Sequence, residues 1–301
     1  MSTAAIPEEP QIAPTGFPKL TVDGVREWAM QPQVLGGAAI IALFLAAFST
    51  FSVTTFQLWI EPDSYYQHAP LVPFAMGYLL YHNREKILAA PIKPTLWPLP
   101  LLIAICGLQI VAMWTFFLAP QSLLFVAGLA TLSLMFYGWQ RTWHMLPAIG
   151  YSIMALPIWN RIIDDHTNNL QIWSTSGAYY LLKIIGMEPF RAEPTVINLP
   201  HYNLYIAAAC SGMKLTLALI ASTALIMMIA RLKWWGNLIL LGLMLPLAVA
   251  INSLRIALIG ILGNQFGSDA GEWMHHYGSY GTLLLAFWIL YFTAKKLGWK
   301  V

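Results

Sequence analysis

Four residues in the last third of the chain have side chains that can act together in acyl transfer: Cys210, Arg255, His275 and His276. A cysteine thiolate is a strong nucleophile, and a nearby imidazole can take its proton and later give it to the leaving amine. An arginine can stabilise the oxyanion that forms on the attacked carbonyl. Ser211 and Gly212 follow the thiol directly, and a glycine allows a bound peptide to approach closely, so both are candidate substrate-binding residues.

Each of these side chains also has an ordinary structural interpretation. A cysteine in an apolar helix is often a small buried residue, which is what we expect of Cys106 and is the alternative for Cys210. Arg255 can extend to lipid headgroups, and a histidine at a loop-to-helix junction can serve as an interfacial anchor. Two cysteines form no disulfide framework and no zinc spacing, so neither a metal nor another cofactor is expected.

The composition determines the solvent in which these residues act. The 301 residues are 58% hydrophobic and 10% charged, with a mean hydropathy of +0.62. Soluble domains carry about 25% charged residues, so a water-soluble globule is excluded. A net charge of +3 without a basic, aromatic-rich stripe gives no indication of a nucleic-acid partner. The chain is predicted to lie in a lipid bilayer.

A helix needs about 20 apolar residues to cross the hydrocarbon core. On that rule the sequence predicts an all-α polytopic membrane protein with about eight transmembrane helices. Their approximate limits are 36–59, 69–82, 96–118, 122–138, 143–158, 209–230, 235–262 and 278–294. The long remaining stretch, 160–207, is predicted to form an amphipathic helix on the membrane and then a short β-like segment, Thr195–Leu199, with a hairpin turn.

Basic residues predict the orientation of these spans. Lysine and arginine gather before the first span, after the second, fourth and sixth, and at the C-terminus, which places those points on the cytoplasmic side. The predicted organisation is a cytoplasmic tail at 1–34, a transmembrane domain at 35–296 and a cytoplasmic tail at 297–301. Cys210, Arg255 and the histidine pair then reach the same depth at the outer face.

The other polar residues are expected at surfaces. His68, His144, His166 and His201 are interpreted as surface or interfacial side chains. Asp164 and Asp165 precede His166 directly, and neighbouring residues on a helix do not face one another. They are therefore interpreted as the solvated face of the amphipathic helix.

Several motifs resemble the exosortase family, the bacterial membrane cysteine transpeptidases related to archaeosortases. The run from Ala209 to Lys214 resembles the family's A-C-S-G motif with its following apolar and basic residues, and Asn252 to Arg255 resembles its N-x-x-R. The segment from Tyr66 to Pro73 is similar to the family's Y-S-H-G-x-L-V-P. The last span opens with a histidine, as in family members. The likeness extends over about residues 59–294.

The sequence departs from the family at two points. Family members commonly carry a glutamate two residues before the cysteine, where this chain has Ala208. The family's H-x-x-x-G is also altered: counting from Glu272 selects His276, whereas accepting Ser279 in place of glycine selects His275. We take His276 as the acid/base residue and keep His275 as the alternative.

The resemblance implies an activity and partners. Cys210 would be the nucleophile and Arg255 the essential cation, with Lys214 and Asn252 added as substrate-binding residues. The substrates would be exported proteins whose C-terminal sorting tail has a Pro-Glu-Pro-like motif, a transmembrane helix and a basic end. Cleavage would occur at the outer face of the bacterial inner membrane, with transfer to a surface glycan or lipid as a possible second step. The oligomeric state and the acceptor stay open.

Two other classes of function are compatible with a polytopic membrane protein. A small-molecule transporter would use Arg255 and the histidine along a substrate path, but the sequence lacks the two similar halves typical of repeat-built transporters. A non-catalytic component of exopolysaccharide export would need no reactive thiol.

Overall fold

The structure is a computed structural model that describes residues 31–62 and 64–299. Its contacts divide the chain into two units, residues 1–46 and 47–301. The described part of the first unit is most of α2 (Pro32–Ala47). The tail predicted at 1–34 therefore lies almost wholly outside the described residues, and only part of the tail predicted at 297–301 is described.

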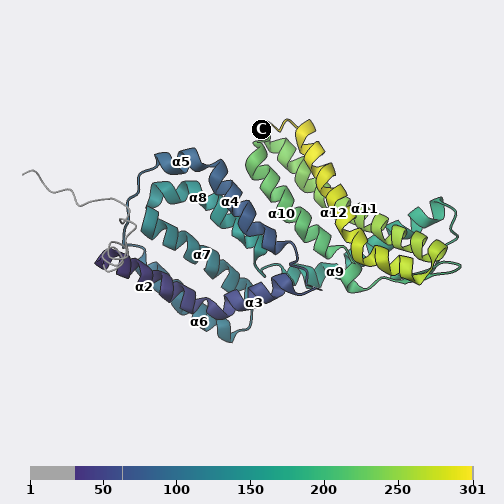
Figure 1. Ribbon diagram of the computed structural model, residues 1–301, viewed down its shortest axis with the longest axis horizontal. Helices are drawn as coiled ribbons and strands as arrows, with labels where there is room; N and C mark the ends of the chain where they lie inside the picture. The colour runs from purple at the N-terminus through teal and green to yellow at the C-terminus, as the bar shows by residue number, and fades with distance from the viewer. Residues whose placement is uncertain (1–30, 63, 300–301) are drawn as a thin grey trace, which may run out of the picture. The chain divides into compact units, whose positions relative to one another are not determined.

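The second unit is mainly helical (Figure 1). Its α-helices are α3 (Ser49–Ile60), α4 (Val72–His82), α5 (Arg84–Ala89), α6 (Leu99–Trp114), α7 (Leu118–Tyr137), α8 (Trp139–Tyr151), α9 (Asn160–Ile184), α10 (Met213–Ala230), α11 (Trp234–Phe266) and α12 (Ser268–Lys296). Short 3₁₀ turns are η1 (Ala69–Leu71), η2 (Ser152–Ala155) and η3 (Ala208–Cys210). Strands β1 (Phe190–Glu193), β2 (Val196–Asn198) and β3 (Asn203–Tyr205) pair antiparallel in that order.

The helical membrane architecture agrees with the prediction, but the count of eight spans is not confirmed. Among the described residues, three helices are long and apolar enough to cross a membrane: Leu118–Tyr137, Ala208–Ala230 and Trp234–Phe266. The pair Pro32–Ala47 and Ser49–Ile60 makes a fourth if it forms one broken span. Three of the predicted spans correspond to helices shorter than the roughly 20 residues that a crossing needs. Helices α4, α6 and α8 have 11, 16 and 13 residues.

The last helix begins earlier than the sequence analysis expects. The sequence predicts a span from 278, whereas α12 begins at Ser268, directly after Gly267, whose φ is +90°. The polar stretch from Asp269 to His276 is therefore helical. His275 and His276 lie about two turns inside α12 and not at a junction between loop and helix.

The segment between α8 and α10 folds back onto the membrane helices. The predicted amphipathic helix is α9, whose buried face packs against α11. Gly177 permits this contact, because a Cβ at this position would overlap the side chain of Ser253. The predicted β-like segment corresponds to β2. The N–H of Leu199 donates to the carbonyl of Tyr202 across the hairpin turn. Strand β1 was not anticipated.

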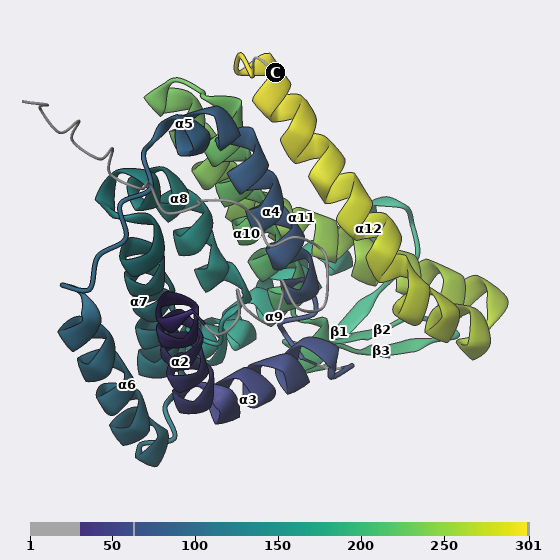
Figure 2. The ribbon, with the colours of Figure 1, turned by 60° about the vertical axis from the view of Figure 1, so that its left-hand side comes forward.

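Helices α10, α11 and α12 pack on one another through small and branched side chains. Ala286, Leu290 and Ala294 recur every four residues on α12 and are fully buried in the hydrophobic core that the three helices share. Helix α10 packs against both α4 and α12. It lies between them in Figure 1, whereas α4 overlaps it in the turned view of Figure 2. The turn that carries Cys210 leads into this arrangement at the start of α10.

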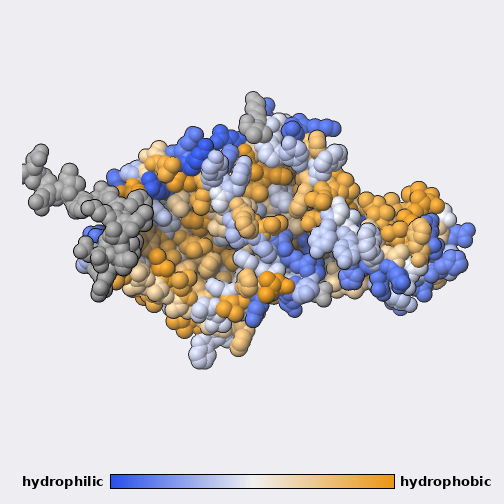
Figure 3. Space-filling model, in the orientation of Figure 1, coloured by the Kyte–Doolittle hydropathy of each residue, from blue (hydrophilic) through white to orange (hydrophobic). Residues whose placement is uncertain are grey.

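The surface has the polarity expected of a chain embedded in lipid. Large apolar side chains are widely exposed, among them Phe74, Leu101 and Trp288. Figure 3 shows hydrophobic residues across much of the visible face and hydrophilic residues gathered over α5. Arg141 fixes this polar region by donating to the carbonyls of Leu88 and Ala90.

Candidate active site

Cys210 lies at the end of η3, immediately before α10. Ser211 and Gly212 make the turn between the two helices, and Gly212 adopts a left-handed φ of +92° that a residue with a Cβ rarely accepts. The hydroxyl of Ser211 accepts a hydrogen bond from the N–H of Met213 at 3.3 Å. The turn holds the thiol at the amino end of α10, where the partial positive charge of the helix favours anions.

Asn252 ties this turn to α11. Its side chain is 1% exposed, and its Nδ2 donates to the backbone oxygen of Cys210 at 3.0 Å. A Cβ on Gly212 would stand 2.9 Å from the Cγ of Asn252, so the amide packs directly against the glycine. Gly212, in the turn after Cys210, and Asn252 on the next helix are therefore parts of one contact.

His275 contacts the thiol. Its Nε2 lies 2.8 Å from the Sγ of Cys210. His276 has its ring centroid 5.6 Å from that of His275, at an interplanar angle of 90°. The two rings diverge because successive residues on a helix point about 100° apart. The geometry therefore brings His275, which the sequence analysis kept as the alternative to His276, within hydrogen-bond reach of the thiol.

Arg255 stands beside this pair. It lies three residues after Asn252, so both side chains emerge on one face of α11. Its Nη2 donates to the backbone oxygen of His275 at 3.1 Å, and its Nε is buried with no hydrogen-bond partner among the described residues. A guanidinium held by one bond and otherwise unsatisfied can donate to a substrate oxygen.

One cavity of about 1020 Å³ contains the whole constellation. Of the residues named from the sequence, the following line it: Cys210, Gly212, Lys214, Asn252, Arg255, His275 and His276. Lys214 lies on one wall of the cavity, and its Nζ donates to the carbonyl of Pro62 at 3.2 Å. Ser211 is fully buried and is not a lining residue, because its hydroxyl faces the backbone of α10. Cys106 is buried in α6, as expected.

The sequence that forms this cavity matches a known protein family. The family described as transmembrane exosortase matches residues 59–293. The chain belongs to the transmembrane exosortase family. Members of the family are in general membrane cysteine transpeptidases that act in protein sorting. No curated protein and no solved structure gave a match.

The matched region of this exosortase also contains a histidine whose position was not foreseen. The sequence analysis interprets His68 as a surface or interfacial side chain; in the structure it is half-buried and lines the same cavity. Its Nε2 lies 3.1 Å from the oxygen of Met154, and its Nδ1 has no partner among the described residues. Burial lowers the pKa of His68, and the hydrogen bond to the Met154 carbonyl partly offsets this decrease. The resemblance of Tyr66 to Pro73 to a family motif was the available signal.

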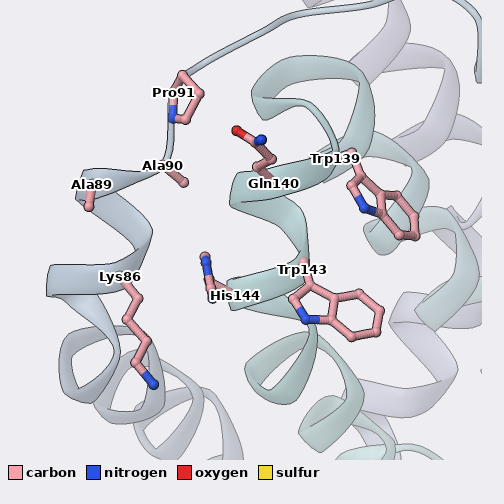
Figure 4. Close-up of a pocket in the computed structure, with 8 residues that line it drawn as sticks. All are labelled: Lys86, Ala89, Ala90, Pro91, Trp139, Gln140, Trp143 and His144. Carbon is pink, nitrogen blue, oxygen red and sulfur yellow. The ribbon is translucent and has the colours of Figure 1, made fainter.

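A second hollow of about 520 Å³ lies between α5 and α8 (Figure 4). His144 points toward α5, whereas the rings of Trp139 and Trp143 point away from it. These indoles are exposed and lie near each other, with centroids 5.7 Å apart. The hollow has no lining residue in common with the cavity around Cys210, and the exposed indoles fit the aromatic belt of a membrane protein.

Proposed function

We propose that this exosortase is a membrane-embedded cysteine protease or transpeptidase that uses Cys210, His275 and Arg255. Its substrates are exported proteins with a C-terminal tail made of a Pro-Glu-Pro-like motif, an apolar helix and a basic end. The observation that carries the proposal is the 2.8 Å contact between Sγ of Cys210 and Nε2 of His275 inside a cavity. A pair within hydrogen-bond reach is the arrangement that thiol acyl transfer needs.

In the first half of the reaction, the imidazole of His275 takes the thiol proton and the thiolate attacks the scissile carbonyl. A C–S bond forms, and the carbonyl oxygen becomes an oxyanion that receives hydrogen bonds from Arg255. When this intermediate collapses, the C–N bond breaks and the imidazolium gives its proton to the leaving amine. The products are a thioester on Cys210 and a free tail helix.

In the second half, an acceptor resolves the thioester. His275 takes a proton from the incoming hydroxyl or amine, which attacks the thioester carbon. Collapse then breaks the C–S bond, and the thiolate recovers a proton from the imidazolium. Water as acceptor gives hydrolysis, whereas a hydroxyl or amine on a surface glycan or lipid gives transfer. The same two side chains serve both outcomes.

The sidedness belongs to the proposal as well. Eight crossings with both termini in the cytoplasm place the cavity at the outer face of the inner membrane, where an exported protein presents its tail. The basic residues support this orientation. Arg84 and Lys86 lie in α5, beyond the far end of α4 from the loop that carries His68, and Arg141 lies at the other end of α8 from Met154, which His68 contacts.

The test is cleavage of a reporter protein that carries such a tail, in cells that produce each variant. Cys210→Ala should abolish cleavage while the protein remains inserted. His275→Ala should slow cleavage roughly 100- to 10,000-fold, the usual contribution of a general base. His276→Ala is the matched control and should change the rate far less.

Arg255→Lys tests the oxyanion role in the same assay. The compact ammonium lacks the forked donors of the guanidinium, and loss of one oxyanion donor costs roughly 100- to 1000-fold. Normal cleavage by Cys210→Ala would remove the thiol mechanism. A large loss with His276→Ala but not with His275→Ala would reassign the base.

A further inference from the structure

The cavity around Cys210 has a polar end and a long apolar extension. The polar end carries the reactive side chains together with Gln67, His68 and Lys214. Beyond it the lining continues through Leu215 and Leu225 on α10, Phe74 on α4, and Leu283 and Phe287 on α12. A small polar substrate would use only the first part, so the second part needs an apolar occupant.

The extension follows the helix axes over a considerable length. On α10 the lining runs from Lys214 to Leu225, and on α12 from His275 to Phe287. At 1.5 Å per residue these distances are about 16 Å and about 18 Å. Each is more than half of the roughly 30 Å hydrocarbon core. The cavity is therefore a groove that leads from Cys210 along α10, a helix long and apolar enough to cross a membrane.

The floor of the groove is suited to a close helix contact. Ala218, Ala221, Ser222 and Leu225 recur on α10 at the spacing of one helical face, and all four line the cavity. Small residues on such a face let another backbone approach closely, which is how helices associate in lipid. Helices α4 and α12 both pack against α10 (Figure 1), and their lining residues form the walls of the groove.

We propose that this groove, lined by α4, α10 and α12, holds the transmembrane helix of the substrate during cleavage. The inference rests on the proposed function, which requires a tail helix next to the scissile bond. A helix about 10 Å across that fills 1020 Å³ is about 13 Å long, or roughly nine residues. Continuity with Cys210 supports this occupant, because the end of a helix seated here lies at the thiol. The binding energy of this remote apolar segment then positions the reacting carbonyl.

Leu283→Trp tests the groove, and Leu284→Trp is its matched control. Leu283 lines the groove, whereas its neighbour Leu284 is 67% exposed and is not a lining residue. Filling the groove should lower kcat/KM for a tail-bearing substrate roughly 10- to 200-fold, the range seen when an apolar pocket is mismatched. Leu284→Trp should leave cleavage unchanged. In both variants Cys210 should react at the normal rate with a small water-soluble thiol reagent, with Cys210→Ala as the background. A normal rate shows that the site is folded.

Photo-crosslinking identifies the occupant. A benzoylphenylalanine in place of Phe287 should crosslink to the tail helix of the substrate in Cys210→Ala protein, and the same probe in place of Trp288 should not. Crosslinks from position 287 to phospholipid alone, or full cleavage by Leu283→Trp, would overturn the groove inference. Cleavage that survives Cys210→Ala would instead overturn the proposed function, so the two failures are distinguishable.

Discussion

Replacing Gly212 by alanine is expected to slow cleavage by two separable routes. The first is backbone strain, because φ at Gly212 is +92° and a left-handed L-residue costs about 1–2 kcal/mol. The second is displacement of Asn252, whose Cγ and Nδ2 would both lie 2.9 Å from the new Cβ. The amide then loses its hydrogen bond to the oxygen of Cys210. Removing one partner of a buried hydrogen bond costs about 1–3 kcal/mol.

These magnitudes predict a non-additive cycle. If the costs fall on the reactive geometry, Asn252→Ala lowers kcat/KM about 5- to 150-fold and Gly212→Ala about 30- to several thousand-fold. Gly212→Ala already includes the loss of the Asn252 hydrogen bond. The double variant should therefore be little slower than Gly212→Ala alone, with an interaction energy of about 1–3 kcal/mol.

The assay is cleavage of a purified tail-bearing substrate by the four proteins in detergent, with thermal unfolding measured in parallel. The rate of Cys210 alkylation reports separately on whether the thiol has moved. Rate factors that simply multiply in the double variant would refute the reasoning, since they would mean that Gly212 and Asn252 act independently.

Two further predictions concern residues around the site. Gly177→Ala should destabilise the α9–α11 contact by about 1–3 kcal/mol, because the new Cβ would overlap the side chain of Ser253. Gly242→Ala on α11 is the control and should be neutral, because its Cβ meets nothing within 4 Å. Thermal unfolding of both variants in detergent compares them. Burial lowers the pKa of His68 below its usual 6.5, so the unfolded chain binds the proton more readily and stability should fall as the pH drops below about 6.5. His68→Gln should reduce this acid sensitivity of the unfolding temperature, and an unchanged pH profile would contradict it.

The helical membrane class and two of the residues that line the candidate site could be predicted from the sequence for clear physical reasons. Charge is so scarce in this chain that an arginine inside an apolar run needs an explanation, which singles out Arg255. Counting residues along the helices placed it at the depth of Cys210, and both residues line one cavity. Depth can be read from a sequence because the rise per residue in a helix is fixed.

The choice between His275 and His276 depends on a quantity that residue counting does not provide. Adjacent positions share a depth but differ in direction by about 100°, so the phase of the helix decides which ring meets the thiol. The sequence does not give that phase, because the polar stretch before 278 is typical of a loop, whereas the helix begins at Ser268. The place of His68 in the cavity could not be predicted for a related reason. Its hydrogen-bond partner Met154 and the other lining residues come near it only through tertiary packing.

The length of α11 bears on the fate of the acyl-enzyme in the proposed mechanism. Its 33 residues extend about 50 Å, some 20 Å more than the hydrocarbon core, and Arg255 lies about 32 Å from the first residue. The thioester would therefore form at the boundary, with water on one side and apolar lining on the other. An acceptor must compete there with a solvent of about 55 M. Efficient transfer would then require an acceptor held in place before the tail helix departs.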